Sequence, residues 1–164
     1  MDEFTRKPFD FDAYVHDIQT KPCFLCEIVA KNPEYAHHLI YEDDIAIAFL
    51  NNYPTLYGYT LVAPKEHREQ VTGDFSAEEY LELQRVIYRV GEAVRLETDA
   101  ERVYILSLGS QQGNKHVHWH IAPLPRGVPF EEQQLAALGI EKGVVDLSDV
   151  EMAALAGRLR QRLS

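Results

Sequence analysis

The stretch HVHWHIAP at residues 116–123 constrains the fold of this chain more than any other segment. Its polar and apolar residues alternate, so in a β-strand the imidazoles of His116, His118 and His120 share one face, spaced about 6.6 Å apart. The apolar residues between them point to the opposite face, where a hydrophobic core would receive them. The segment therefore predicts a strand with one buried face and one face that carries three histidines.

Periodicity and helix caps predict the other elements. Capping boxes at Ser76 and Ser148, each with a glutamate three residues on, begin a long helix expected to end near residue 96 and a C-terminal helix. Short helices are expected at residues 11–18 and 25–30. Strands are expected at residues 38–41, 45–50, 59–63, 102–108 and 117–124. Short connections favour antiparallel pairing, so we predict an α+β fold with one antiparallel sheet of about five strands.

Length and composition exclude several classes of protein. A chain of 164 residues suits one domain spanning 1–164. Its net charge of −10 makes it a poor binder of nucleic acid or anionic membrane. No apolar run approaches the ~20 residues of a membrane span, and no signal peptide follows the N-terminal charges. Two cysteines cannot form a disulfide framework, so we expect a reducing, cytoplasmic setting.

The two cysteines form the motif CFLC at residues 23–26. The two-residue gap lets both Cys23 and Cys26 thiolates reach one metal ion, but this spacing leaves the remaining ligands undefined. A redox pair uses the same spacing, usually at a helix start that follows a strand, and no strand is expected before Cys23. A pair of free buried thiols is the third reading.

The loop before the histidines, GSQQGNK at residues 109–115, has the composition of an anion site. Its glycines let the backbone approach a ligand, and amide groups of the backbone, Gln112 and Asn114 can hold an anion. Neutral imidazole is a good nucleophile towards phosphorus, so loop and histidines together favour phosphoryl or nucleotidyl transfer. A metal site through all three imidazoles, a histidine-rich surface strand and a plain connecting loop remain alternatives.

Four motifs in register resemble the histidine triad (HIT) superfamily. They are CFLCEIVA at residues 23–30, IYEDDIAIAFLN at residues 40–51, GYTLVAPKEH at residues 58–67, and the histidine row with Gln112 four residues before it. The resemblance covers about residues 22–125, which leaves residues 126–164 as a C-terminal extension. It implies a HIT-like fold and a homodimer, which we expect to form through the long helix and the strand after it.

The resemblance also implies roles for individual residues. His118 would be the nucleophile of a covalent nucleotidyl intermediate, His120 would contact the α-phosphate region, and Asn51 would bind the ribose hydroxyls. The implied catalytic residues are His116, His118, His120 and Gln112. The substrate-binding residues are Asn51, Gln112, Gly113 and Asn114. A structural zinc, as in zinc-containing members of the superfamily, would be held by Cys23, Cys26, His67 and His116.

These roles predict a nucleotide hydrolase that acts at the α-phosphate of dinucleoside polyphosphates or other nucleoside phosphate conjugates. A phosphorylase or nucleotidylyltransferase, with phosphate or a sugar phosphate as acceptor, shares the covalent step. A nucleotide-binding regulatory module with little turnover is the non-enzymatic alternative.

The chain also departs from the superfamily pattern. Tyr59 stands where a fourth histidine is frequent, Gly113 replaces a common serine or threonine, and Ser107 replaces a frequent asparagine. The loop at residues 107–112 is about two residues short. These departures weaken an assignment as a phosphoramidase in the narrow sense.

Overall fold

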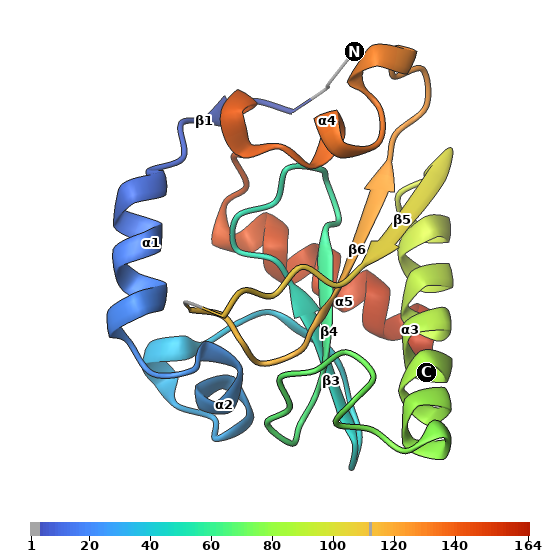
Figure 1. The fold of residues 1–164 in the computed structure, drawn as a ribbon. Coiled ribbons are helices and arrows are strands. Elements are labelled where there is room, and N and C mark those ends of the chain that lie inside the picture. Colours follow the sequence, from blue (N-terminus) through green and yellow to red (C-terminus); the bar gives the residue numbers. More distant parts are fainter. Residues whose placement is uncertain (1–3, 112) are drawn as a thin grey trace.

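The computed structural model describes residues 4–111 and 113–164, and its centre is a five-stranded antiparallel sheet (Figure 1). The strands lie in the order β2-β3-β4-β6-β5. Their bounds are β2 (Leu39–Glu42), β3 (Ala46–Leu50), β4 (Thr60–Pro64), β5 (Arg102–Leu106) and β6 (Trp119–Leu124). The predicted α+β fold with a sheet of about five antiparallel strands is confirmed.

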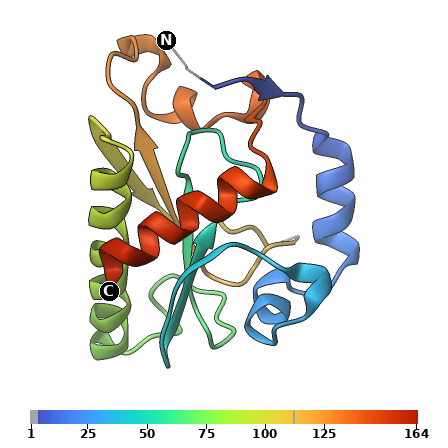
Figure 2. The same cartoon turned by 180° about the vertical axis from the view of Figure 1, so that it is seen from behind.

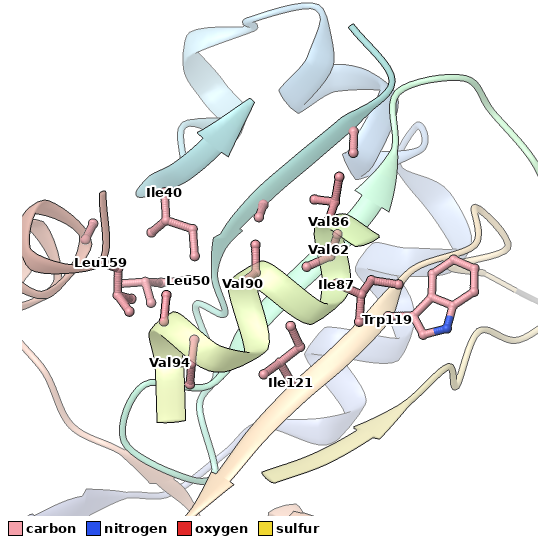
Figure 3. Close-up of a cluster of buried hydrophobic side chains, with 14 of the residues drawn as sticks. Ile40, Leu50, Val62, Val86, Ile87, Val90, Val94, Trp119, Ile121 and Leu159 are labelled. Atoms are coloured by element: carbon pink, nitrogen blue, oxygen red, sulfur yellow. The ribbon is translucent and has the colours of Figure 1, made fainter. Parts of the chain in front are cut away.

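Two helices cover one face of this sheet. The long helix α3 (Ala77–Glu97) lies beside β5 and β6, and the C-terminal helix α5 (Asp149–Leu163) crosses the back of the sheet (Figure 2). Their apolar side chains meet those of the strands in one buried cluster, which includes Val90 of α3, Leu159 of α5 and Ile121 of β6 (Figure 3). Burial of such side chains is the main source of stability for a fold of this kind.

Both helices begin at the capping boxes that the sequence predicts. The Ser76 hydroxyl accepts a hydrogen bond from the Glu79 backbone N–H at 3.2 Å, and the Glu79 carboxylate accepts one from the Ser76 N–H at 2.8 Å. Ser148 and Glu151 repeat the arrangement at the start of α5. Each box satisfies backbone donors that a helix N-terminus leaves open.

The opposite face of the sheet is covered by shorter elements. Here the short helix α2 (Phe24–Val29) and the 3-10 turn η1 (Pro33–Tyr35) pack on a second buried cluster that includes Leu25, Phe49 and Leu61. In the register of β4 and β6, Leu61 stands opposite His120. The histidines therefore share the face that α2 covers.

Strand β6 begins at Trp119, two residues later than the sequence predicts. The reason is that the Val117 N–H donates to the Arg68 carbonyl at 2.7 Å, in the loop after β4, instead of joining the sheet ladder. His116 and His118 thus precede the strand. Strand β5 likewise ends at Leu106, where its last partner in β6 is His120.

The N-terminal arm and the C-terminal extension are joined by a feature that the sequence did not predict. Strands β1 (Arg6–Lys7) and β7 (Val144–Val145) form a separate two-stranded antiparallel sheet. Helix α1 (Phe11–Thr20) follows β1 and stands apart from the central sheet (Figure 1). The extension before β7 contains η2 (Phe130–Glu132), α4 (Leu135–Leu138) and η3 (Ile140–Lys142). Among the described helices, none has the length and apolar character needed to cross a membrane.

Candidate active site and metal cluster

The three histidines, two just before β6 and one within it, lie together on the face that α2 covers. His116 and His118 are buried, and His120 is partly buried. The ring centroids of His118 and His120 are 4.9 Å apart, and the Phe24 ring of α2 meets His118 edge-on at 5.9 Å. The rings of His118 and His120 thus lie side by side, whereas the His116 ring packs against His67.

The His118 ring is fixed by its backbone. Its Nδ1–H donates to the His116 carbonyl oxygen at 2.7 Å, and the Ser107 hydroxyl donates to the His118 carbonyl at 2.7 Å. Since a carbonyl only accepts, Nδ1 must carry the proton, and Nε2 of the neutral ring keeps its lone pair. Burial lowers the pKa of His118, against a smaller opposing effect of the hydrogen bond to His116. The ring is therefore neutral at pH 7.

The His120 ring has a different partner. Its Nδ1 lies 3.0 Å from the Tyr59 hydroxyl, at the position where the sequence departs from the superfamily. Its Nε2 is buried and has no hydrogen-bond partner among the residues of the described ranges. Burial, and then the neighbouring His118, lower the pKa of His120 to about 3, whereas burial raises the pKa of Tyr59 to about 12. Both side chains are neutral over the ordinary pH range.

A pocket of about 420 Å³ opens over His118 and His120. Asn51, Gly113 and Asn114 also line it, so the structure brings together the predicted substrate-binding residues that it describes. The Asn51 side-chain oxygen accepts from the Tyr53 N–H at 2.9 Å, and the Asn114 side-chain oxygen accepts from the Ser110 N–H at 3.2 Å. These bonds fix both carboxamides at the rim.

Gln112 was predicted as both a catalytic and a substrate-binding residue. It lies outside the described residues.

The N-terminal helix α1 supplies one wall of this pocket, through Tyr14 and Ile18 among others. A Cβ atom at Gly113 would lie 2.9 Å from two side-chain carbons of Ile18, so the helix fills the space that a side chain there would need. The Tyr14 ring also contacts Tyr53 at the rim, with centroids 5.8 Å apart. The helical spacing of apolar residues predicted this helix, but periodicity does not reveal which surface a helix covers.

Beside the pocket lies a cluster of two thiols and two imidazoles, from Cys23, Cys26, His67 and His116. Their nearest ligand atoms lie within 4.8 Å of one another. The Sγ–Nδ1 distances are 3.6 Å from Cys23 to His116, 3.3 Å from Cys26 to His67 and 3.7 Å from Cys26 to His116. Tetrahedral zinc, with Zn–S near 2.3 Å and Zn–N near 2.0 Å, requires S–N separations of roughly 3.5 Å. The cluster is therefore compatible with a zinc site.

Hydrogen bonds on the far side of both imidazoles orient them for this role. His116 Nε2 lies 2.9 Å from the Pro64 carbonyl oxygen, and His67 Nε2 lies 3.2 Å from a Glu69 carboxylate oxygen. Both partners are acceptors, so the protons belong on Nε2 and the Nδ1 lone pairs face the thiols. Neither Pro64 nor Glu69 was predicted from the sequence as a partner of these imidazoles. A carboxylate two residues after His67 was the available signal for one of them.

His116 consequently belongs to the cluster on one side and supports the histidine row on the other. Its ring faces the thiols, and its carbonyl accepts the Nδ1–H of His118. A metal ion bound by the cluster would therefore restrain the His116 backbone, whose carbonyl orients the His118 ring.

A five-stranded antiparallel sheet with a histidine row, a pocket above it and a Cys₂His₂ cluster beside it matches the class of fold and site that the motifs resemble. The model of the HIT domain family matches residues 32–126, more than half of the chain. The chain belongs to the HIT family.

Two curated relatives illustrate its place in the family. An uncharacterized HIT-like protein of Borreliella burgdorferi is 30% identical over 126 residues, which cover 73% of this chain and 89% of that protein. An adenosine 5'-monophosphoramidase of Schizosaccharomyces pombe is 28% identical over 132 residues, which cover 73% of this chain and 94% of that protein.

Solved structures show the same fold. A hypothetical histidine triad nucleotide-binding protein of Sulfolobus tokodaii has a TM-score of 0.68 and 26% identity, covering 86% of this chain and 91% of that one. A zinc-bound histidine triad family protein of Mycobacterium smegmatis has a TM-score of 0.66 and 24% identity, covering 86% of this chain and 92% of that one.

Proposed function

We propose that this chain is a nucleotide hydrolase or nucleotidyl transferase that acts at the α-phosphate of nucleoside phosphate conjugates or dinucleoside polyphosphates. One observation carries the proposal: His118 is held neutral, with Nε2 unprotonated, at a pocket large enough for a nucleotide. Asn51 at the rim would bind the ribose, and the loop that contains Gly113 and Asn114 would bind phosphate. The names of the S. pombe and S. tokodaii relatives support a nucleotide as ligand.

In the proposed first step, the lone pair of His118 Nε2 attacks the α-phosphorus. A P–N bond forms as the bond from phosphorus to the leaving group breaks. The leaving group takes the electron pair of that bond and a proton from water. His120 contacts a phosphate oxygen and stabilises charge that develops on it.

In the second step, a water molecule attacks the phosphorus of the nucleotidyl-histidine. Its proton passes to solvent, the P–N bond breaks and the electron pair returns to His118 Nε2. The product is a nucleoside monophosphate. If inorganic phosphate attacks in place of water, the product is a nucleoside diphosphate, as in the phosphorylase alternative.

The Cys₂His₂ cluster is proposed to hold a structural zinc. The donor set, the S–N distances and the oriented imidazoles support it, as does the zinc bound by the M. smegmatis fold neighbour. Zinc there would cross-link α2, the loop after β4 and the start of the histidine row. We propose a reducing, cytoplasmic setting as well, because thiol ligands of a zinc ion persist where cysteines are kept reduced.

A homodimer through α3 and β5 is also proposed. β5 is an edge strand of the central sheet, and Ile105 on it and Tyr88 on α3 are large exposed apolar side chains. An exposed edge strand flanked by apolar side chains suits pairing with a second copy about a twofold axis. Sedimentation at micromolar concentration tests this, and a monomer there contradicts it.

The experiment that tests the proposed activity is a turnover screen of the zinc-loaded protein. Adenosine phosphoramidate, dinucleoside polyphosphates and nucleotide sugars are supplied with and without inorganic phosphate, and products are identified by mass. Monophosphate products indicate hydrolysis, and diphosphate products that depend on phosphate indicate the phosphorylase. If the protein binds nucleotides but turns over none of these substrates, the result contradicts an enzyme and supports the regulatory module.

A further inference from the structure

The contact between Tyr59 and His120 defines the hydrogen-bonding state of the histidine at the pocket. The Tyr59 ring is buried in the second core cluster, beneath α2, and its hydroxyl reaches His120 Nδ1 at 3.0 Å. Gly58, with a φ of 83°, turns the chain immediately before this tyrosine, a backbone conformation that suits glycine. The local sequence thus delivers the hydroxyl to one place.

Only one arrangement of protons satisfies this contact. Among the described residues, His120 Nδ1 is the one hydrogen-bond partner of the Tyr59 hydroxyl. If Nδ1 carried the ring proton, the buried phenolic hydrogen would have no acceptor, which costs about 1–3 kcal/mol. If the hydroxyl donates to Nδ1, both groups are satisfied and the ring proton is on Nε2.

The neighbouring ring has the opposite tautomer. His118 carries its proton on Nδ1, because that nitrogen faces the His116 carbonyl, which can only accept. The two rings, 4.9 Å apart, thus present a lone pair at His118 and an N–H at His120.

We propose that Tyr59 is a positioning residue that holds His120 as an Nε2–H donor to a phosphate oxygen beside the nucleophile. This rests on the proposed function for the identity of the ligand, although the tautomer itself does not. The buried Nε2 has no partner in the described part of the chain, so it needs an acceptor, and phosphate oxygens are strong acceptors. In a chain of net charge −10, an anion must be held by such local donors.

The presence of Tyr59, where the superfamily frequently has a histidine, preserves a hydrogen-bond donor to His120. A phenol at residue 59 donates one hydrogen bond to Nδ1, and an imidazole at that position can do the same through a ring N–H. A phenylalanine fills the same space and donates nothing. The three side chains therefore separate the hydrogen bond from the packing of the ring.

The tautomers can be read directly by two-bond ¹H–¹⁵N correlation spectra of the zinc-loaded protein labelled with ¹⁵N-histidine. We expect His120 to carry its proton on Nε2 and His118 on Nδ1. In Tyr59→Phe, His120 should become a mixture of tautomers, and turnover should fall by about tenfold or more, as for loss of a donor to a phosphate oxygen. Tyr59→His should restore a single Nε2–H tautomer and most of the turnover.

Tyr57→Phe is the matched control, because Tyr57 packs against the cluster under α3 and α5, where its hydroxyl accepts a hydrogen bond from Arg158. It should change neither the spectrum nor the turnover. An Nδ1–H tautomer at His120 in the wild-type protein overturns the proposal, even if Tyr59→Phe fails to fold. So does an unchanged His120 spectrum in Tyr59→Phe. Absence of turnover on every nucleotide conjugate instead contradicts the proposed function, while the spectra and an AMP titration still decide the inference.

Discussion

The two faces of the central sheet differ in what they bury: one carries the larger apolar core, and the other carries the histidines and the pocket. Beneath α3 and α5, one continuous cluster of aliphatic side chains is buried together with Trp119. Beneath α2 the second cluster is smaller, and His118 and the partly buried His120 stand at its edge, facing the pocket. Strand β6 contributes to both faces, so one alternating segment serves the core and the site.

This contrast shows how the fold can place polar groups in its interior. Burying an imidazole costs free energy unless its nitrogens find partners. On the face with the histidines, a carbonyl pairs with His118 and a phenol pairs with His120. One nitrogen of His120 has no hydrogen-bond partner among residues 4–111 and 113–164. The face under α3 and α5 buries the larger apolar cluster, so we expect it to provide most of the stability.

The largest expected effect is on turnover, from His118→Ala on the site face. Loss of the nucleophile should lower turnover at least about 1000-fold, or roughly 4 kcal/mol in the activation free energy, while nucleotide binding survives. Steady-state kinetics with AMP binding by calorimetry measures both. His118→Gly with added imidazole should recover part of the activity.

His16→Ala is the control, since this exposed histidine of α1 does not line the pocket. If His118→Ala retains more than about a tenth of wild-type turnover, only ~1.4 kcal/mol has been lost, and covalent catalysis at this residue is wrong.

The next effect concerns the metal cluster, which links the site face to the loop after β4. Cys26→Ser should lose bound zinc and lower the free energy of unfolding by several kcal/mol, because ligand binding and folding are coupled. Metal analysis should find about one zinc per chain in the wild type, and less than about half would contradict the proposed site. Thermal melts with a chelator and after zinc return show whether the loss is reversible.

On the face that α3 and α5 cover, we expect a substitution to change stability and not turnover. Leu155 of α5 is completely buried, so Leu155→Ala should cost about 2–5 kcal/mol of unfolding free energy. Val150→Ala on the same helix removes an exposed side chain and should change stability by less than about 0.5 kcal/mol. Urea denaturation measures both. A changed turnover number in fully folded Leu155→Ala protein would show that the two faces are not independent.

Much of this division could be predicted from the sequence, because it depends on local patterns. The alternation through residues 116–121 assigned the histidines and the apolar residues to opposite faces, and the register of Leu61 with His120 agrees. The capping boxes at Ser76 and Ser148 located both covering helices. The CFLC motif placed two thiols together, although only the resemblance pointed to His67 and His116.

The remainder depends on contacts between distant segments. Strands β1 and β7 have two residues each, too few for periodicity to register, and exist because each pairs with the other. The approach of Ile18 to Gly113 and the bond from Tyr59 to His120 likewise require the folded chain. The resemblance identified Gly113 and Tyr59 as departures from the superfamily pattern. It did not indicate which residues they contact.

The smallest effect is expected at the junction of the two covering helices. Glu97 at the end of α3 has a side chain only 11% exposed, with Arg158 Nε at 2.5 Å and Arg162 Nε at 2.7 Å from its carboxylate oxygens. Burial alone would raise the pKa of Glu97, but the hydrogen bonds from Arg162 and Arg158 outweigh it and lower the pKa.

A carboxylate with a lowered folded-state pKa adds stability above its unfolded pKa of about 4.3, and this stability is lost as pH falls through the lower folded value. Glu97→Gln should therefore cost up to about 1 kcal/mol at pH 7, and the difference from wild type should shrink below about pH 4 and in high salt, with turnover unchanged. Urea denaturation at both pH values measures it, and a difference that grows on acidification would contradict this role of the ion pairs.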